Sequence, residues 1–368
     1  MCYVYFLGAG FSAAYGLPVM NQFFSAARQS TLLKPEEKIF LDGVERFAHA
    51  GVRLVAISRN NMEEILSFLE MAKQAGQIPQ RLAELSKIGD KAIPPLELLR
   101  SIIARVYGPL DGAAFKVVPE RVVTIFGLDG TSPIPDFPAT QKQAQRPLPP
   151  RRFQEILPER TFITTNYDLC LETQLLRIHP NFKLRLVGDW ISAEGHPQGQ
   201  GDTSCIYDQK SRAKLIRLHG AVNWNSSGQE VSGKPYKLRV ASNTDLQGSL
   251  PWAIGQQFYT DNPTAPIIVA PTVFKHQADG PYAEQWREAA MALAAATQLV
   301  FIGYSFPESD AYMRYFLGAS LAENVALEAI HIIDPKADEI VDRLHKGGHY
   351  GEHFLDMLKA YNRSWHLD

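Results

Sequence analysis

The feature that most constrains the fold is a recurring pattern in which a short apolar run ends in a polar or glycine-containing turn. The runs cover residues 3–7, 161–164, 214–218, 266–269, 299–302 and 329–333. Helical patterns separate most of them, and this alternation predicts an α/β fold with a doubly wound, parallel, Rossmann-like sheet. Ligands of such sheets bind at the carboxyl ends of the strands, where the unusual polar residues of this chain fall.

The long segment between the first two runs, residues 22–125, is predicted to be a mainly helical insertion. Met62, Ile65, Leu66 and Leu69 have the spacing of an amphipathic helix, and a proline pair at residues 94–95 opens a second such pattern. Residues 127–152 contain six prolines and few large apolar residues, which predicts an exposed loop. We therefore expect one α/β domain over residues 1–368 that carries these two additions.

Composition narrows the class of protein. A formal net charge of -2 gives no general attraction to nucleic acid or to an anionic membrane. The three cysteines are far apart and form no C-x-x-C pair, which argues against a metal site and fits a reducing cytoplasm. No signal peptide is visible, and the apolar stretch 291–306 is interrupted by polar residues, so it predicts a helix end and a strand. We expect a cytoplasmic protein without a metal.

A glycine loop follows the first apolar run. Gly8 and Gly10 stand between a strand and a helix, where backbone N–H groups can hold a pyrophosphate, and Ala13 completes a loose dinucleotide fingerprint. The alternative is a tight turn that simply needs glycine. A dehydrogenase would also need a second strand and an acidic residue about 20 positions on, whereas Glu36 and Glu37 follow a proline in a helical pattern. A dinucleotide would therefore bind in another arrangement.

Polar residues end the second run as Thr165-Asn166-Tyr167-Asp168. The side chain of Asn166 both donates and accepts hydrogen bonds, which suits ribose hydroxyls and a positioned water. Asp168 could orient Asn166 or stabilise a developing cationic sugar. The alternative for Asp168 is an Asx-turn that caps the following helix.

Later runs end in further candidates. His219 precedes a glycine, where it can reach an open cleft and transfer protons, or it can be a structural histidine bound to a backbone carbonyl. Gly303-Tyr304-Ser305 could contact phosphate or ribose, or form only a tight turn. Asp334 could hold the adenosine end of a dinucleotide, or only end its strand.

The order of these motifs is more specific than any one of them. G-A-G-x-S, G-L-P, T-T-N-Y-D, L-H-G and G-Y-S, in that order, resemble the SIR2 (sirtuin) family, and most of all the SIR2-like domains of bacterial anti-phage defence proteins. The resemblance implies a SIR2-like α/β fold that binds NAD as substrate. It implies catalytic roles for Asn166, His219 and Asp168. The residues that it implies as NAD contacts are Gly8, Ala9, Gly10, Phe11, Ser12, Leu17, Pro18, Thr165, Gly303, Tyr304, Ser305 and Asp334.

The chain also departs from sirtuin deacylases. Residues 221–262 contain no cysteine, so the four-cysteine zinc module of the deacylases is missing. Met20 and Asn21 replace the aromatic and arginine residues with which deacylases shield the ribose, and Thr165 replaces a glutamine. These departures favour water as the acceptor, which implies an NAD glycohydrolase that releases nicotinamide and ADP-ribose.

Two other functions stay open on the sequence. One is an NAD-dependent protein deacylase or ADP-ribosyltransferase, and the other is a catalytically quiet subunit that senses NAD or ADP-ribose. The resemblance further implies anti-phage defence by NAD depletion and a homo-oligomer. Activation would come from self-assembly or from a separately encoded partner such as a HerA-like ATPase or an Argonaute-like protein.

Overall fold

The structure is a computed structural model of the 368-residue chain. It describes residues 2–52, 61–107, 126, 160–178, 184–187, 191–194, 211–222, 224–226, 238–241, 268, 281–307, 310–322 and 324–362.

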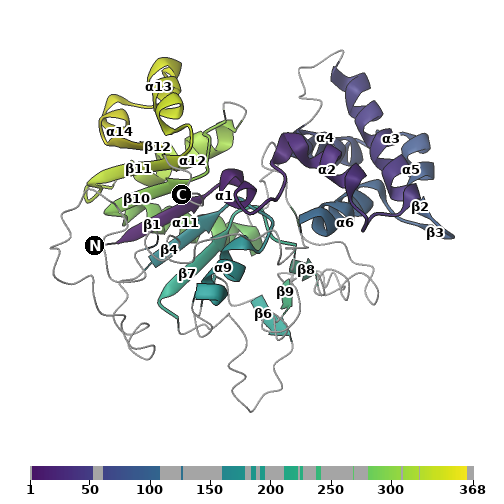
Figure 1. The fold of residues 1–368 in the computed structure, drawn as a ribbon, viewed down its shortest axis with the longest axis horizontal. Helices are drawn as coiled ribbons and strands as arrows, with labels where there is room; N and C mark the ends of the chain where they lie inside the picture. Colours follow the sequence, from purple (N-terminus) through teal and green to yellow (C-terminus); the bar gives the residue numbers. More distant parts are fainter. Residues whose placement is uncertain are drawn as a thin grey trace, which may run out of the picture.

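A parallel sheet lies in the left half of the structure in Figure 1. Its seven described strands are β1 (Tyr3–Leu7), β4 (Arg160–Thr164), β5 (Arg185–Leu186), β7 (Ala213–Arg217), β10 (Gln298–Ile302), β11 (Ala329–Asp334) and β12 (Leu358–Asn362). The strand order is β12-β11-β10-β1-β4-β7-β5, and every pairing is parallel. Apart from the edge strand β5, this is the 3-2-1-4-5-6 order of a Rossmann sheet. The predicted doubly wound fold is confirmed.

The register brings the central strands to the same level at their carboxyl ends. Leu7 of β1 pairs with Ile302 of β10 on one side and with Thr164 of β4 on the other, and Thr164 pairs with Arg217 of β7. Strands β4, β5 and β7 lie on one side of β1, whereas the later strands β10, β11 and β12 lie on its other side. Rossmann sheets bind ligands where the strand order reverses in this way, which here is between β1 and β10. The turns after these four strands therefore meet along one edge.

Helices flank the sheet and also form a separate group toward which β1 runs (Figure 1). That group contains α2 (Phe23–Gln29), α3 (Pro35–Val52), α4 (Met62–Gln74), α5 (Gln80–Leu85) and α6 (Pro95–Tyr107). The other described α-helices precede or follow strands of the main sheet in the sequence. They are α1 (Ala9–Ala13), α9 (Cys170–Ile178), α11 (Pro281–Ala294), α12 (Ala311–Leu321), α13 (Ala337–Gly347) and α14 (Glu352–Asp356), and a short 3-10 helix η1 spans Met20–Gln22. No helix within the described ranges is long and apolar enough to cross a membrane.

Smaller strands lie outside the main sheet. A hairpin joins β2 (Lys87–Ile88) to β3 (Lys91–Ala92), and a second small sheet has the order β6 (Ile191–Glu194), β9 (Leu238–Ala241), β8 (Trp224–Ser226).

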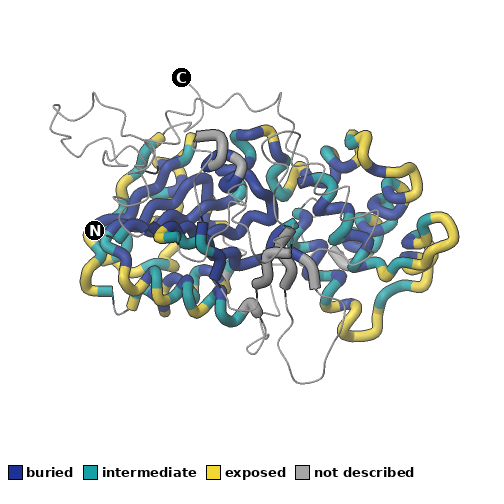
Figure 2. Tube along the Cα trace, turned by 90° about the horizontal axis from the view of Figure 1, so that it is seen from below, coloured by how far each residue is buried: buried dark blue, intermediate teal, exposed yellow. Residues whose placement is uncertain are grey.

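The core lies on both faces of the main sheet, because alternate residues of a strand point to opposite faces. Tyr5 and Leu7 belong to the cluster that includes the apolar faces of α2, α3, α4 and α6, whereas Val4 and Phe6 belong to the cluster packed with α11, α12 and α13. Figure 2 shows the strands buried and the exposed segments on the outer helices and turns. Burial on both faces explains why the strands have continuous apolar sequences.

Most of the expected elements are present. Helices α2 to α6 lie within the segment 22–125, and residues 291–306 contain the end of α11 followed by β10, which confirms the expected helix end and strand. In the expected run 266–269 only Ile268 is described, and it forms an antiparallel bridge with Gly220 where a parallel strand was expected. The proline-rich segment 127–152 lies outside the described residues, and the bounds of the insertion stay a prediction.

A buried histidine couples the stability of the sheet to pH. Nε2 of His331 lies 2.8 Å from Oε1 of Gln298, which only accepts, and Nδ1 lies 3.2 Å from the hydroxyl of Tyr361. This pairing fits the neutral ring. Desolvation by burial, with a smaller effect of the Lys359 charge, lowers the pKa of His331 from 6.5 to about 4.

We expect His331 to destabilise the fold as pH falls from 6.5 to 4. In this window the unfolded chain binds the proton and the folded chain does not, so acid removes roughly 3 kcal/mol of the free energy of unfolding. Urea unfolding of the wild type and His331→Gln at pH 7 and pH 4.5 measures the effect. The variant should lose less stability than the wild type between the two pH values, and equal losses would show that His331 does not contribute.

Candidate functional site

The first residues after four neighbouring strands line the carboxyl edge of the sheet. They are Gly8 after β1, Thr165 after β4, Leu218 after β7 and Gly303 after β10. Backbone hydrogen bonds extend the pairing by one residue, since Thr165 N donates to Leu7 O at 3.3 Å and Leu218 N to Thr164 O at 3.0 Å. The predicted motifs are thus adjacent in space although they are up to about three hundred residues apart in the sequence.

Glycines at three positions allow the glycine loop to pack directly on the turn after β10. Gly10 N donates to Gly303 O at 2.8 Å. A Cβ on Gly8 would lie 2.6 Å from Gly303 O, and one on Gly10 would lie 2.8 Å from Gly303 Cα. Gly303 itself has a φ of +60°, and its Cβ would lie 2.2 Å from Phe11 N. Backbone packing therefore requires these glycines, whatever ligand the loop binds.

Replacing Gly303 by alanine should disrupt this junction. The added Cβ meets backbone atoms that cannot move aside, so we expect a fall of several kcal/mol in the free energy of unfolding, or loss of the folded protein. Gly348→Ala is a matched control, because Gly348 has a φ of +61° and nothing within 4 Å of its Cβ position. It should cost only about 1–2 kcal/mol for the left-handed backbone. Equal costs in a urea titration would contradict the packing account.

Asn166 joins the turn after β4 to the glycine loop. The residue is 5% exposed, and its Nδ2 donates to Gly8 O at 2.8 Å and to Ser12 Oγ at 2.9 Å. Its backbone N donates to Thr164 Oγ1 at 3.0 Å. Because both amide hydrogens are engaged, the orientation of the amide is fixed, and Oδ1 accepts no hydrogen bond from the described residues. Oδ1 is the atom through which Asn166 can accept a hydrogen bond from a hydroxyl or a water.

Asp168 shares Ser12 with Asn166. Its Oδ1 accepts from Cys170 N at 2.9 Å, which is the expected Asx-turn at the start of α9, and its carboxylate also has a side-chain hydrogen bond with Ser12. Burial raises the pKa of Asp168 above its ordinary value, although the hydrogen bonds with Ser12 and Cys170 and the charge of Arg217 oppose the rise. The helix-capping role and a place in the polar cluster are therefore both present.

His219 lies in the turn after β7, next to the turn that carries Asn166. Two backbone hydrogen bonds bracket it, from Leu218 N to Thr164 O at 3.0 Å and from Val222 N to Tyr167 O at 2.8 Å. The imidazole is 1% exposed, and its ring centroid lies 6.3 Å from that of Tyr167 and 6.2 Å from that of Trp286. The structure thus brings His219 beside the Asn166 turn, within an aromatic enclosure.

A buried ion pair beneath these turns was not predicted from the sequence. Arg217 and Glu172 form a salt bridge with side chains 1% and 0% exposed, and Nη1 of Arg217 donates to Asn166 O at 3.0 Å. Arg217 N also donates to Gln285 Oε1 at 2.9 Å, which ties α11 to β7. Arg217 therefore holds the backbone carbonyl of Asn166 in place. The sequence feature that could have indicated this ion pair is the charge of Arg217 within an apolar run.

A second missed residue comes from the helical group. Glu63, in the first turn of α4, accepts a hydrogen bond from the hydroxyl of Tyr167 at 3.3 Å. Burial raises the pKa of Tyr107 well above its ordinary value, and the charges of Glu63 and Asp168 add to this rise. The helical group therefore places a carboxylate near the Asn166 turn. In the sequence Glu63 looked like an ordinary acidic residue at a helix start.

The other predicted contacts have varied positions. Ala9 is partly exposed at the loop, and Thr165 is buried beside Asn166. Phe11 and Leu17 are buried in the core, with Phe11 packed edge-on against Tyr15 at 5.5 Å, whereas Pro18 is partly exposed. Tyr304 donates to Asp310 Oδ2 at 3.4 Å, and Ser305 is exposed. Asp334 ends β11, two strands from β1, and its Oδ1 accepts from Lys336 N at 2.9 Å, so it is not part of the Asn166 cluster.

Metal ligands do not gather among the described residues. No group of three or more His, Cys, Asp or Glu side chains there could hold a metal ion.

Comparison with known families agrees with this architecture. A family model for the SIR2-like domain matches residues 160–348, slightly more than half of the chain. The protein therefore belongs to the SIR2-like domain family. No curated protein matches the chain. The match begins at β4, yet β1 and the glycine loop lie between β4 and β10, so the N-terminal motif completes the sheet of the matched domain.

SIR2-like domains bind NAD and are NAD-utilising enzymes. The residues present fit that ligand. The partly exposed Ala9–Gly10 segment offers backbone at the switch point of the sheet, where dinucleotides bind. Asn166 Oδ1, Asp168 and His219 supply polar groups at the two adjacent strand ends.

Proposed function

We propose that this protein is an NAD glycohydrolase. It cleaves the bond between nicotinamide and ribose, and water supplies the new oxygen on the ribose C1′ carbon. The balanced reaction converts NAD⁺ and water to nicotinamide, ADP-ribose and a proton. The bond electrons leave with nicotinamide, whose ring nitrogen becomes neutral.

The observation that carries this proposal is the fixed orientation of Asn166. Its amide hydrogens are held by Gly8 O and Ser12 Oγ, so Oδ1 is the acceptor presented to a ligand. An acceptor in a water-poor, preorganised site can orient a ribose hydroxyl or the attacking water without rearrangement during the reaction. Arg217 supports this geometry by holding the Asn166 carbonyl.

His219 and Asp168 complete the proposed chemistry. As nicotinamide departs, positive charge develops on the ribose, and a nearby carboxylate such as Asp168 stabilises it. His219 accepts a proton from a ribose hydroxyl or from the attacking water. The enclosure by Tyr167 and Trp286 limits the water that can reach the imidazole.

Water is the proposed acceptor because of the loop that follows α1. Asn21 is exposed, and Met20 accepts a hydrogen bond at its Sδ from the Tyr107 hydroxyl at 3.8 Å, which holds it against the helical group. Neither residue is an aromatic cover for the ribose. The alternatives are a protein deacylase or ADP-ribosyltransferase, and a catalytically quiet NAD or ADP-ribose sensor.

The identity of the acceptor can be tested by product analysis. We expect NAD consumption by the purified protein to be unchanged when an acetyl-lysine peptide is added, with ADP-ribose as the sugar product in mass spectra. Appearance of acetyl-ADP-ribose, with consumption that depends on the peptide, would contradict hydrolysis and support deacylation. NAD that binds but persists would support the sensor function.

We also propose a biological setting for the reaction. Depletion of NAD would halt phage growth by stopping the infected bacterial cell. The active form would be a homo-oligomer or a complex with a separately encoded partner, such as a HerA-like ATPase or an Argonaute-like protein. The resemblance of the motif order to anti-phage SIR2-like domains supports this setting.

A further inference from the structure

A basic hollow lies on the α12 and α13 side of the turn after β10. Its volume is about 330 Å³, part of which is open to solvent. The residues that line it are Phe306, Pro307, Arg314, Arg343, Leu344, Gly347, His349 and Tyr350. None of them belongs to the glycine loop or to the Asn166 cluster.

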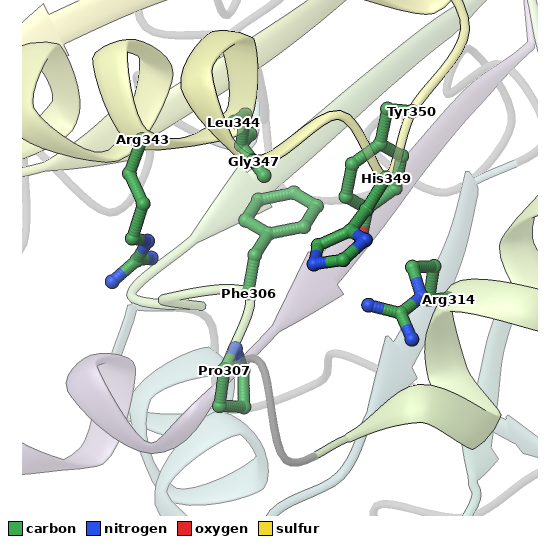
Figure 3. Close-up of a pocket in the computed structure, with 8 residues that line it drawn as sticks. All are labelled: Phe306, Pro307, Arg314, Arg343, Leu344, Gly347, His349 and Tyr350. Atoms are coloured by element: carbon green, nitrogen blue, oxygen red, sulfur yellow. The ribbon is translucent and has the colours of Figure 1, made fainter.

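Two arginines give the hollow its charge. Figure 3 shows the guanidinium groups of Arg314 and Arg343 on opposite sides of the Phe306 ring, with His349 between Phe306 and Arg314. Within the described ranges, neither arginine forms a salt bridge with a carboxylate. Arg343 donates through Nη2 to Ser305 O, and its other N–H groups, which form no hydrogen bond with the described residues, are further donors.

The charges of both arginines affect one half-buried phenol, that of Tyr350. Burial raises the pKa of Tyr350 to about 12, the charges of Arg314 and Arg343 lower it, and that of Asp310 raises it. Asp310 is tied to the start of α12, since its Oδ1 accepts from Met313 N at 3.0 Å and its Oδ2 from Tyr304. The lining of the hollow therefore includes two guanidinium groups, and the carboxylate of Asp310 is near enough to Tyr350 to oppose their effect on its pKa.

The backbone at the hollow is strained. Phe306 has a φ of 49°, in the left-handed region that bulky residues rarely adopt, and its ring is 4% exposed. Its ring centroid lies 4.6 Å from that of Phe301, 4.9 Å from that of Tyr304 and 6.1 Å from that of Tyr350. Strain of this kind persists where the surroundings fix it, and it clusters at ligand sites.

We propose that this hollow binds the phosphate of a nucleotide other than the NAD at the glycine loop. Guanidinium groups bind phosphate oxygens through paired, charge-assisted hydrogen bonds, and two of them line this hollow on opposite sides of Phe306. The aromatic and imidazole rings of Tyr350 and His349 give a flat base a surface to stack on. This proposal does not rest on NAD cleavage.

Calorimetric titration with AMP tests the proposal, and adenosine, which lacks the phosphate, is the ligand control. We expect AMP to bind, adenosine to bind at least tenfold more weakly, and Arg314→Ala and Arg343→Ala each to weaken AMP roughly tenfold or more. Lys346→Ala is the protein control, because Lys346 is an exposed cation of α13 that does not line the hollow. It should leave AMP affinity unchanged, and thermal unfolding shows whether each variant is folded.

A second titration separates this site from that of NAD. It uses carba-NAD, which cannot be cleaved because a methylene replaces the ribose oxygen. We expect its affinity to be unchanged in Arg314→Ala and Arg343→Ala and unaffected by saturating AMP. Three results would each overturn the proposal: no AMP binding to the wild type, equal AMP affinity in the folded arginine variants, or competition between AMP and carba-NAD.

Discussion

Replacing Asn166 by alanine should lower the rate of nicotinamide release by roughly 100-fold or more. The change removes the Oδ1 acceptor, which is the group that we propose orients the ribose hydroxyl or the attacking water. It also removes the two hydrogen bonds to Gly8 O and Ser12 Oγ, so some loss of stability accompanies it. Chromatographic separation of nicotinamide from NAD over time measures the rate.

A second asparagine controls for that loss of stability. Asn324 also donates to two backbone carbonyls, Leu293 O at 2.7 Å and Ala296 O at 2.9 Å. These carbonyls precede β10, so Asn324 lies near the amino end of that strand and not at the carboxyl edge of the sheet. Asn324→Ala should therefore destabilise the protein to a similar extent and leave the rate of nicotinamide release unchanged. Equal rates in both folded variants would remove Asn166 from the proposed mechanism.

Replacing Arg217 by methionine should destabilise the fold by about 3–5 kcal/mol. The change leaves the carboxylate of Glu172 buried without its ion-pair partner, and it removes the hydrogen bond to Asn166 O. Urea unfolding followed by circular dichroism measures the free energy. Because the Asn166 carbonyl loses its hydrogen bond with Arg217, the folded fraction of the variant should also release nicotinamide more slowly than the wild type.

Two controls show whether burial is the cause. The double variant Arg217→Met with Glu172→Leu should recover most of the stability, since removing both charges avoids the unpaired one. Arg28→Ala breaks the ion pairs of the exposed Arg28 with Asp42 and Glu45 at the surface, and it should cost no more than about 1 kcal/mol. A cost for Arg217→Met as small as that of Arg28→Ala would contradict the structural role of the buried pair.

The sheet could be predicted from the sequence because its strands are buried on both faces. Strands such as β1 and β10 are continuous apolar runs, and five of the six expected runs correspond to strands of the described sheet. Strand β12 could not be predicted in this way, because it is an edge strand in which three residues are partly buried and the other two, Lys359 and Asn362, are exposed and polar. The two-residue strand β5 is too short to carry a pattern.

The site was predictable where it depends on strand ends and not where it depends on packing between distant segments. The sequence could place Asn166 and His219 at the carboxyl edge of the sheet because both follow apolar runs. Glu63 and Arg217 were not, because a charged residue at a helix start or within a strand becomes informative only when its partner is known. The close packing of Gly10 against Gly303 can likewise be recognised only when the pairing of β1 with β10 is known.

The most direct test of NAD hydrolysis is a proton NMR time course of NAD with the wild-type protein and with His219→Ala. We predict that the wild type forms one nicotinamide and one ADP-ribose for each NAD lost, and that His219→Ala, still folded, forms neither. Equal NAD loss with both proteins would contradict the assigned site. Persistence of NAD with a wild-type protein that is saturated with it would contradict the proposed hydrolysis.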